Sequence, residues 1–190
     1  MVRAGGLVAG AALAGLVLAG CGGSGSDRGT TPSASTVTSA SSSASIADPS
    51  ASPSYSVPPE AQVQTEAGAV AFVTFYFEQV NKAWMTPDST LLPPLTESGC
   101  KSCDSLQEHA VDLAAKDQHT TTAAVRVASA TPRVGAPAGQ QFVTIQLDQL
   151  GATTIDSSGA VVDADPVQSL KREVVLVWEG GRWLLYGISA

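Results

Sequence analysis

Apolar residues recur at helical spacing in two stretches of the chain. Across residues 66–84 they fall three or four positions apart, which predicts an amphipathic helix capped by Thr65. Phe75 and Phe77 widen its apolar stripe, so we expect other elements to cover this helix on more than one side. Residues 98–116 have the same spacing on one face only and predict a second helix.

After His119 the apolar pattern changes to alternation, which predicts β-strands. Residues 120–131 alternate loosely, and residues 142–148 alternate cleanly. Residues 156–159, with the sequence Asp-Ser-Ser-Gly, lie between two short apolar runs and predict a hairpin.

A second hairpin is predicted at Gly180-Gly181, a two-residue turn that joins strands over residues 171–178 and 182–188. Both faces of this hairpin are apolar. Helix packing accounts for one face, and the other is expected to line a cavity, meet a second helix or meet a partner. Because a tight turn fixes the register, we expect these opposite pairs: Glu179 with Arg182, Trp178 with Trp183, Val177 with Leu184, Leu176 with Leu185, and Val175 with Tyr186. We interpret the tryptophan pair as packing in preference to a ligand clamp.

The start of the chain has the pattern of an export signal. Arg3 is followed by an uncharged apolar run through Ala19, which is shorter than the ~20 residues needed to span a bilayer. Leu18-Ala19-Gly20-Cys21 is typical of a bacterial lipobox, so we expect residues 1–20 to be a signal peptide cleaved before Cys21. Cys21 would carry lipid, with fatty-acyl chains such as palmitate, and would anchor the extracytoplasmic protein to the outer face of the cell membrane. An uncleaved anchor with a free Cys21 thiol is the alternative.

A segment of low complexity follows the lipobox. All but seven of residues 22–58 are Gly, Ser, Thr, Ala or Pro. Such a segment buries too little apolar surface to fold, so we expect residues 21–58 to be a lipidated, disordered tether. Residues 59–190 are enough for a single domain with its own core.

The net charge of −7 belongs to residues 59–190, because two arginines and two aspartates cancel in residues 1–58. An acidic domain argues against nucleic-acid binding and against electrostatic docking on anionic lipid. The sequence has no glycine-rich phosphate loop, no Ser-His-Asp spacing and no metal-binding helix motif. We therefore expect no cofactor and no metal.

Cys100 and Cys103 form a Cys-x-x-Cys motif, for which we favour a small structural disulfide in an oxidising compartment. A zinc site would need two further ligands, and His109 and His119 do not form a second close pair. A redox site would need a βαβ context, whereas a proline-rich loop precedes this motif.

Few residues are candidates for catalysis. An isomerase-like or cyclase-like site needs a base that faces a hydrogen-bond donor in a dry pocket, and Asp148 with Tyr76 is the one pairing to test. His109 lies three residues before Asp112 on the second predicted helix, where surface solvation is favoured over a proton-transfer pair. Asp112 is also spaced to form an ion pair with Lys116. We assign none of these residues a catalytic role.

A further set of residues carries a resemblance to known proteins. The set is Pro58-Pro59-Glu60-Ala61, Thr65, Gly68-Ala69, Phe72-Val73, Phe75-Tyr76-Phe77, Val80-Asn81, Cys100 and Cys103. Together with the lipobox and the tether, this set resembles a group of actinobacterial lipoproteins of unknown function. The order of elements resembles the α+β cone of the nuclear transport factor 2-like superfamily. The resemblance implies a location at the outer face of the cell membrane. It also implies a fold in which N-terminal helices pack on a curved antiparallel sheet, preceded by the disordered tether. It implies no activity.

These observations favour a non-enzymatic cell-surface lipoprotein whose domain binds a small apolar ligand or an envelope partner. The apolar terminal hairpin and the aromatic first helix motivate this hypothesis. One alternative is an enzyme of the same fold with Asp148, Tyr76 or His109 in its pocket. Another is a homodimer that uses the sheet face for self-association.

Overall fold

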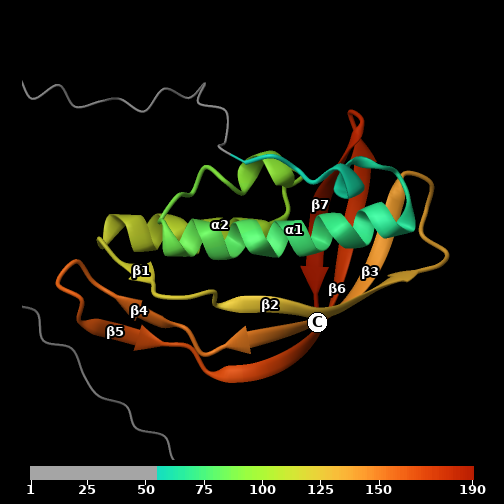
Figure 1. The fold of residues 1–190 in the computed structure, drawn as a ribbon. Coiled ribbons are helices and arrows are strands. Elements are labelled where there is room, and N and C mark those ends of the chain that lie inside the picture. Colours follow the sequence, from blue (N-terminus) through green and yellow to red (C-terminus); the bar gives the residue numbers. More distant parts are fainter. Residues whose placement is uncertain (1–54) are drawn as a thin grey trace, which may run out of the picture. The chain divides into compact units, whose positions relative to one another are not determined.

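Two α-helices lie on one side of an antiparallel sheet in the computed structural model, which describes residues 55–190 (Figure 1). The predicted signal peptide, Cys21 and most of the predicted tether lie outside these residues. The elements are η1 (Pro59–Gln62), α1 (Glu66–Met85), η2 (Pro93–Leu95), α2 (Lys101–Ala115), β1 (His119–Thr120), β2 (Val125–Arg133), β3 (Gln140–Leu150), β4 (Thr153–Ile155), β5 (Val161–Ala164), β6 (Val167–Glu179) and β7 (Arg182–Ser189).

The helix α1 is the centre of the core. It begins where predicted, because Thr65 Oγ1 accepts a hydrogen bond of 3.0 Å from the Gly68 amide. Its aromatic residues are buried on more than one side of the helix, as expected from the wide apolar stripe. The Asn81 side chain joins α1 to β2, since its Oδ1 accepts from the amides of Ala124 and Val125 at 2.9 and 3.0 Å.

The helix α2 packs against α1 and against the edge of the sheet. Trp84 Nε1 donates a hydrogen bond of 3.1 Å to the Leu106 carbonyl, which joins the two helices. The helix begins at Lys101, three residues later than the sequence predicted, because Cys100 has non-helical backbone angles and serves as the N-cap. The Cys100 sulfur accepts a hydrogen bond from the Cys103 amide at 3.3 Å.

The strands form a four-stranded sheet in the order β2-β3-β6-β7 and a three-stranded sheet in the order β1-β4-β5. The long β3–β6 hairpin curves beneath α1 and continues, past a bend after Leu150, into β4 and β5 (Figure 1). Alternate residues of β3 and β6 point into the core beneath the helices: Val143, Ile145, Leu147, Val174 and Leu176. The predicted fold, N-terminal helices packed on a curved antiparallel sheet, is confirmed.

The outer edge of β7 is covered by the segment that precedes α2 and by the first turn of α2. The Glu97 amide donates to the Leu185 carbonyl at 2.9 Å, and the Ile188 amide donates to Ser102 Oγ at 2.9 Å. These contacts occupy backbone groups that an uncovered edge strand would offer to another chain.

The register predicted for the β6–β7 hairpin is confirmed for its first four pairs, from Glu179 with Arg182 to Leu176 with Leu185. The fifth is wrong: Val175 lies opposite Gly187, because a β-bulge follows the fourth pair. Tyr186 is the extra residue of this bulge and is 54% exposed.

The folded domain includes residues that the sequence assigned to the tether. Tyr55 and Val57 pack against the core, and the Tyr55 ring meets the Phe75 ring edge-on with centroids 5.6 Å apart. The domain therefore extends at least to Tyr55, ahead of the predicted boundary at Pro59. Between residues 55 and 190, no helix has the length and hydropathy needed to cross a membrane.

Candidate functional site

A cleft of about 480 Å³ lies where the N-terminal segment, η2 and the β6–β7 turn meet. Its volume is within the range of small-molecule sites. We call it the Trp183 cleft, and it is lined by Tyr55, Ser56, Val57, Ala61, Gln62, Phe72, Pro94, Leu95, Gly181, Arg182 and Trp183.

The floor of the Trp183 cleft is built from core residues. Phe72, Leu95 and Trp183 are each less than 5% exposed and belong to the main hydrophobic cluster. Trp183 Nε1 donates a hydrogen bond of 2.9 Å to the Val63 carbonyl. Because the one polar atom of this side chain has a partner within the protein, the indole offers a ligand apolar surface only.

The two tryptophans of the terminal hairpin have different roles. Their rings meet edge to face, with centroids 5.1 Å apart and planes at 75°. Trp178 packs against the core without lining the Trp183 cleft, whereas Trp183 does both. The packing interpretation therefore holds for the pair, and only one member is available to a ligand in this cleft.

The mouth of the Trp183 cleft carries Tyr55 and Arg182. Burial raises the pKa of Tyr55 to about 12, and the positive charge of Arg182 acts in the opposite direction. The Tyr55 hydroxyl is therefore a neutral donor at physiological pH. Arg182 is exposed and is the only charged residue among the described residues that line this cleft.

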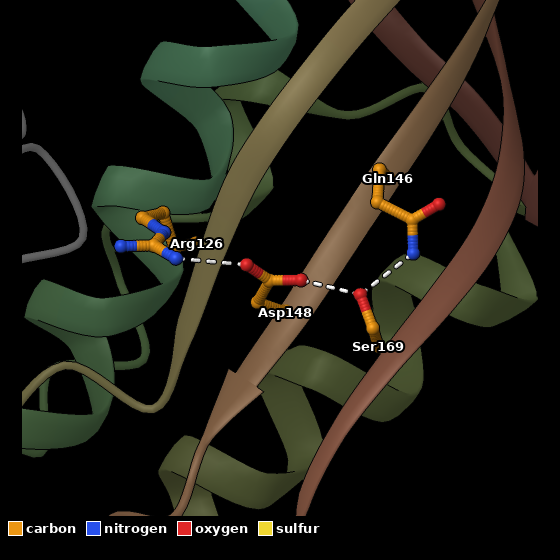
Figure 2. Close-up of polar contacts among 4 residues, drawn as sticks. All are labelled: Arg126, Gln146, Asp148 and Ser169. Atoms are coloured by element: carbon orange, nitrogen blue, oxygen red, sulfur yellow. Dashed lines mark hydrogen bonds and ion pairs between the residues drawn. The ribbon is translucent and has the colours of Figure 1, made fainter.

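Asp148 lies on the face of the sheet that points away from the helices. Figure 2 shows its carboxylate between the Arg126 guanidinium, at 2.8 Å, and the Ser169 hydroxyl, which in turn accepts from Gln146 Nε2 at 2.7 Å. Hydrogen bonds from Ser169 and from Arg126 lower the pKa of Asp148 below its ordinary value of 3.8. This carboxylate is thus held in its ionised form by a surface network.

Tyr76 lies on the other side of the sheet, in the core. Its side chain is fully buried on α1, and its hydroxyl has no hydrogen-bond partner among the described residues. Burial, and to a lesser degree the negative charge of Asp104, raise the pKa of Tyr76. Because residues of β3 alternate between faces, and Leu147 points into the core, Asp148 points away from Tyr76. The structure does not bring together the pair that an isomerase-like or cyclase-like site was expected to use.

His109 is exposed on α2, and its ring meets that of Trp84 edge-on with centroids 4.7 Å apart. Asp112 forms the expected ion pair with Lys116, at 3.9 Å. Neither His109 nor Asp112 lines the Trp183 cleft.

Cys100 and Cys103 are joined by a disulfide at the start of α2, with Cα atoms 5.2 Å apart. Both cysteines are 2% exposed, so the sulfurs are shielded from solvent. No group of three or more side chains among residues 55–190 is arranged to hold a metal ion.

The sequence did not predict the Trp183 cleft, because three of its lining residues lie in the predicted tether. Tyr55 and Val57 are two of the four apolar residues larger than alanine or proline in residues 22–58, and they lie two positions apart at its end. That clustering at the end of the segment is the signal that could have placed the domain boundary earlier.

Comparisons with known proteins give a family and distant structural neighbours. A family model matches residues 48–189 and is described as a family of unknown function, DUF6318. No significant match was found among curated proteins.

The structure is similar to the intermembrane space region of the chloroplast protein ARC6, at 16% identity and a TM-score of 0.48, with 67% of this chain and 96% of that chain covered. It is also similar to an uncharacterized protein with a cystatin-like fold from Caulobacter vibrioides, at 14% identity and a TM-score of 0.40, with 61% and 83% covered. These similarities are too distant to bear on function.

Proposed function

Since the chain belongs to DUF6318, a family of unknown function, we propose from the site alone that it is a binding module whose Trp183 cleft takes a small, largely apolar ligand. One observation carries the proposal: buried core side chains form the floor of a cleft that stays open to solvent. Clefts with apolar walls and a few polar groups are the usual form of small-molecule sites.

A binding role fits the described residues better than catalysis does. The two groups proposed for acid–base chemistry lie on opposite sides of the sheet, and neither Asp148 nor Tyr76 lines the Trp183 cleft. The cleft itself has no residue of acid or base character near neutral pH, since Tyr55 has a raised pKa and arginine stays protonated.

We further propose that the module is held at the outer face of the cell membrane by lipid on Cys21. The lipobox of residues 18–21 and the low-complexity stretch that follows it support this location. A mass measurement on the N-terminal peptide of the purified protein tests it. The expected mass is that of a chain beginning at diacylglyceryl Cys21, and an unmodified Cys21 would contradict the proposal.

The binding role is tested with phenylnaphthylamine, a neutral dye that fluoresces in apolar sites. Ser56 is exposed at the mouth of the Trp183 cleft, so Ser56→Trp should fill the opening and weaken dye binding about tenfold or more. Ser157→Trp, in the exposed β4–β5 turn, is the matched control and should bind the dye like wild type. Equal binding by all three proteins would contradict a site in this cleft.

A further inference from the structure

We infer that the ligand of the Trp183 cleft is an amphipathic anion, with its apolar part on Phe72, Leu95 and Trp183 and its negative group beside Arg182. This inference rests on the proposed function, because it names the class of ligand for the same site.

Arg182 is a cation without a carboxylate partner in an acidic domain. Within residues 55–190, Arg126 pairs with Asp148 and Arg133 pairs with Glu173, while no ion pair forms at Arg182. Lys101, Lys171 and Arg172 also lack an ion pair there, but none of the three lines the Trp183 cleft. The one charge at this apolar site is thus positive and available to a ligand.

Glu179 is the acidic residue nearest to Arg182 along the hairpin. It lies directly opposite Arg182 across the β6–β7 turn, so both side chains project from the same face, yet the two form no ion pair. Glu179 does not line the cleft, whereas Arg182 does.

The polar groups at the mouth of the Trp183 cleft suit a ligand that carries a carboxylate, sulfonate or phosphate group. A guanidinium group presents paired N–H donors that suit the oxygens of such anions. Tyr55 is close enough for the Arg182 charge to affect its pKa, and its protonated hydroxyl adds a neutral donor. Aromatic walls alone would also suit a cationic ligand, but the charge of Arg182 opposes one.

The test uses two dyes of one skeleton that differ in charge. Anilinonaphthalene sulfonate is the anion, and phenylnaphthylamine is its neutral counterpart. Both are titrated into the chain made without residues 1–21, which lacks the apolar export segment and the lipid site and so avoids the detergent that a lipidated protein would need. We expect tighter binding of the anion than of the neutral dye, with a preference that weakens as salt is added.

Arg182→Gln should weaken binding of the anionic dye about tenfold and leave binding of the neutral dye within about twofold. Arg182→Lys should keep part of the preference, since it keeps the charge and loses the paired donors. Arg126→Gln removes the same charge from the far face of the sheet and is the matched control, with both affinities unchanged.

The outcomes separate the inference from the function on which it rests. If Ser56→Trp does not weaken binding of either dye, the cleft is not the site and the proposed function fails. If both dyes bind in the cleft and Arg182→Gln changes neither affinity, the inference fails and the binding role stands. Should Arg182→Gln fold poorly, as judged by circular dichroism, the wild-type preference and its salt dependence decide the question: equal, salt-independent binding of the two dyes overturns the inference.

Discussion

Gly68 occupies a position on α1 where a larger residue cannot fit without moving the chain. A Cβ atom there would overlap the Val63 carbonyl oxygen, which also accepts the hydrogen bond from Trp183. Glycine to alanine inside a helix ordinarily stabilises a protein by about 0.5–1 kcal/mol. Here we expect Gly68→Ala to destabilise by about 1–3 kcal/mol, because overpacking outweighs the gain in helix propensity.

Urea denaturation followed by tryptophan fluorescence measures this change. Gly187→Ala is the control, since a Cβ at that residue meets no atom within 4 Å, and we expect little or no loss of stability. A stabilised Gly68→Ala protein with unaltered fluorescence would show that Val63 is free to move.

Asp148 should titrate below its ordinary pKa of 3.8. Because folding lowers this pKa, the ionised carboxylate stabilises the fold at neutral pH, and that contribution is lost as the pH falls through the lowered value. Ser169→Ala should raise the pKa of Asp148 toward 3.8, since the Ser169 hydrogen bond is the largest single cause of the shift. Titration of the Asp148 carboxyl by NMR gives the answer, and an unchanged pKa in Ser169→Ala would contradict it.

At the scale of elements, the start of α2 depends on one disulfide. The Cys100–Cys103 bond closes a very short loop, so replacing both cysteines with alanine should cost about 1–2 kcal/mol in the free energy of unfolding. Replacement of Cys100 by serine and Cys103 by alanine should recover part of this loss, because serine is a good N-cap. Thiol titration of the denatured, exported protein should find no free thiol at these positions without reductant. Two free thiols would rule out the bond.

The sequence predicted the elements well where local patterns decide them. The Thr65 N-cap and the wide apolar stripe correctly predicted α1. The Gly180-Gly181 turn correctly predicted the first four opposite pairs of the terminal hairpin. The prediction of the fifth pair was wrong because a bulge depends on how Tyr186 and its neighbours fit the curved sheet. The two residues of the turn carry no information about that fit. The predicted strand over residues 120–131 is two elements, β1 and β2, in different sheets.

The candidate site was harder to predict than the fold, because its residues are distant in sequence. Tyr55, Leu95 and Trp183 come together only when three separate segments pack, and no spacing in the chain relates them. Asp148 and Tyr76 were candidates for their side-chain chemistry alone. The alternation of β3 decides on which face of the sheet Asp148 lies. Whether that face is the one covered by the helices is known only from the packed structure.

At the scale of the whole molecule, the membrane location of the protein can be tested independently of ligand binding in the Trp183 cleft. If Cys21 carries the anchor, wild-type protein should sediment with membranes, and a chain made without residues 1–21 should be folded and absent from the membrane fraction. Fractionation with detection by immunoblot measures this, and circular dichroism of the shortened chain checks its fold. Membrane retention of the shortened chain would indicate that some other part of the protein holds it there.

Native mass spectrometry of the full-length protein, purified from its own host, tests the central claim most directly. If the Trp183 cleft binds a small amphipathic ligand, wild type and Ser157→Trp should carry the added mass of a small molecule. Ser56→Trp, with its cleft filled, should have lost that mass. The same bound molecule on Ser56→Trp, or the bare protein mass for all three, would contradict the account.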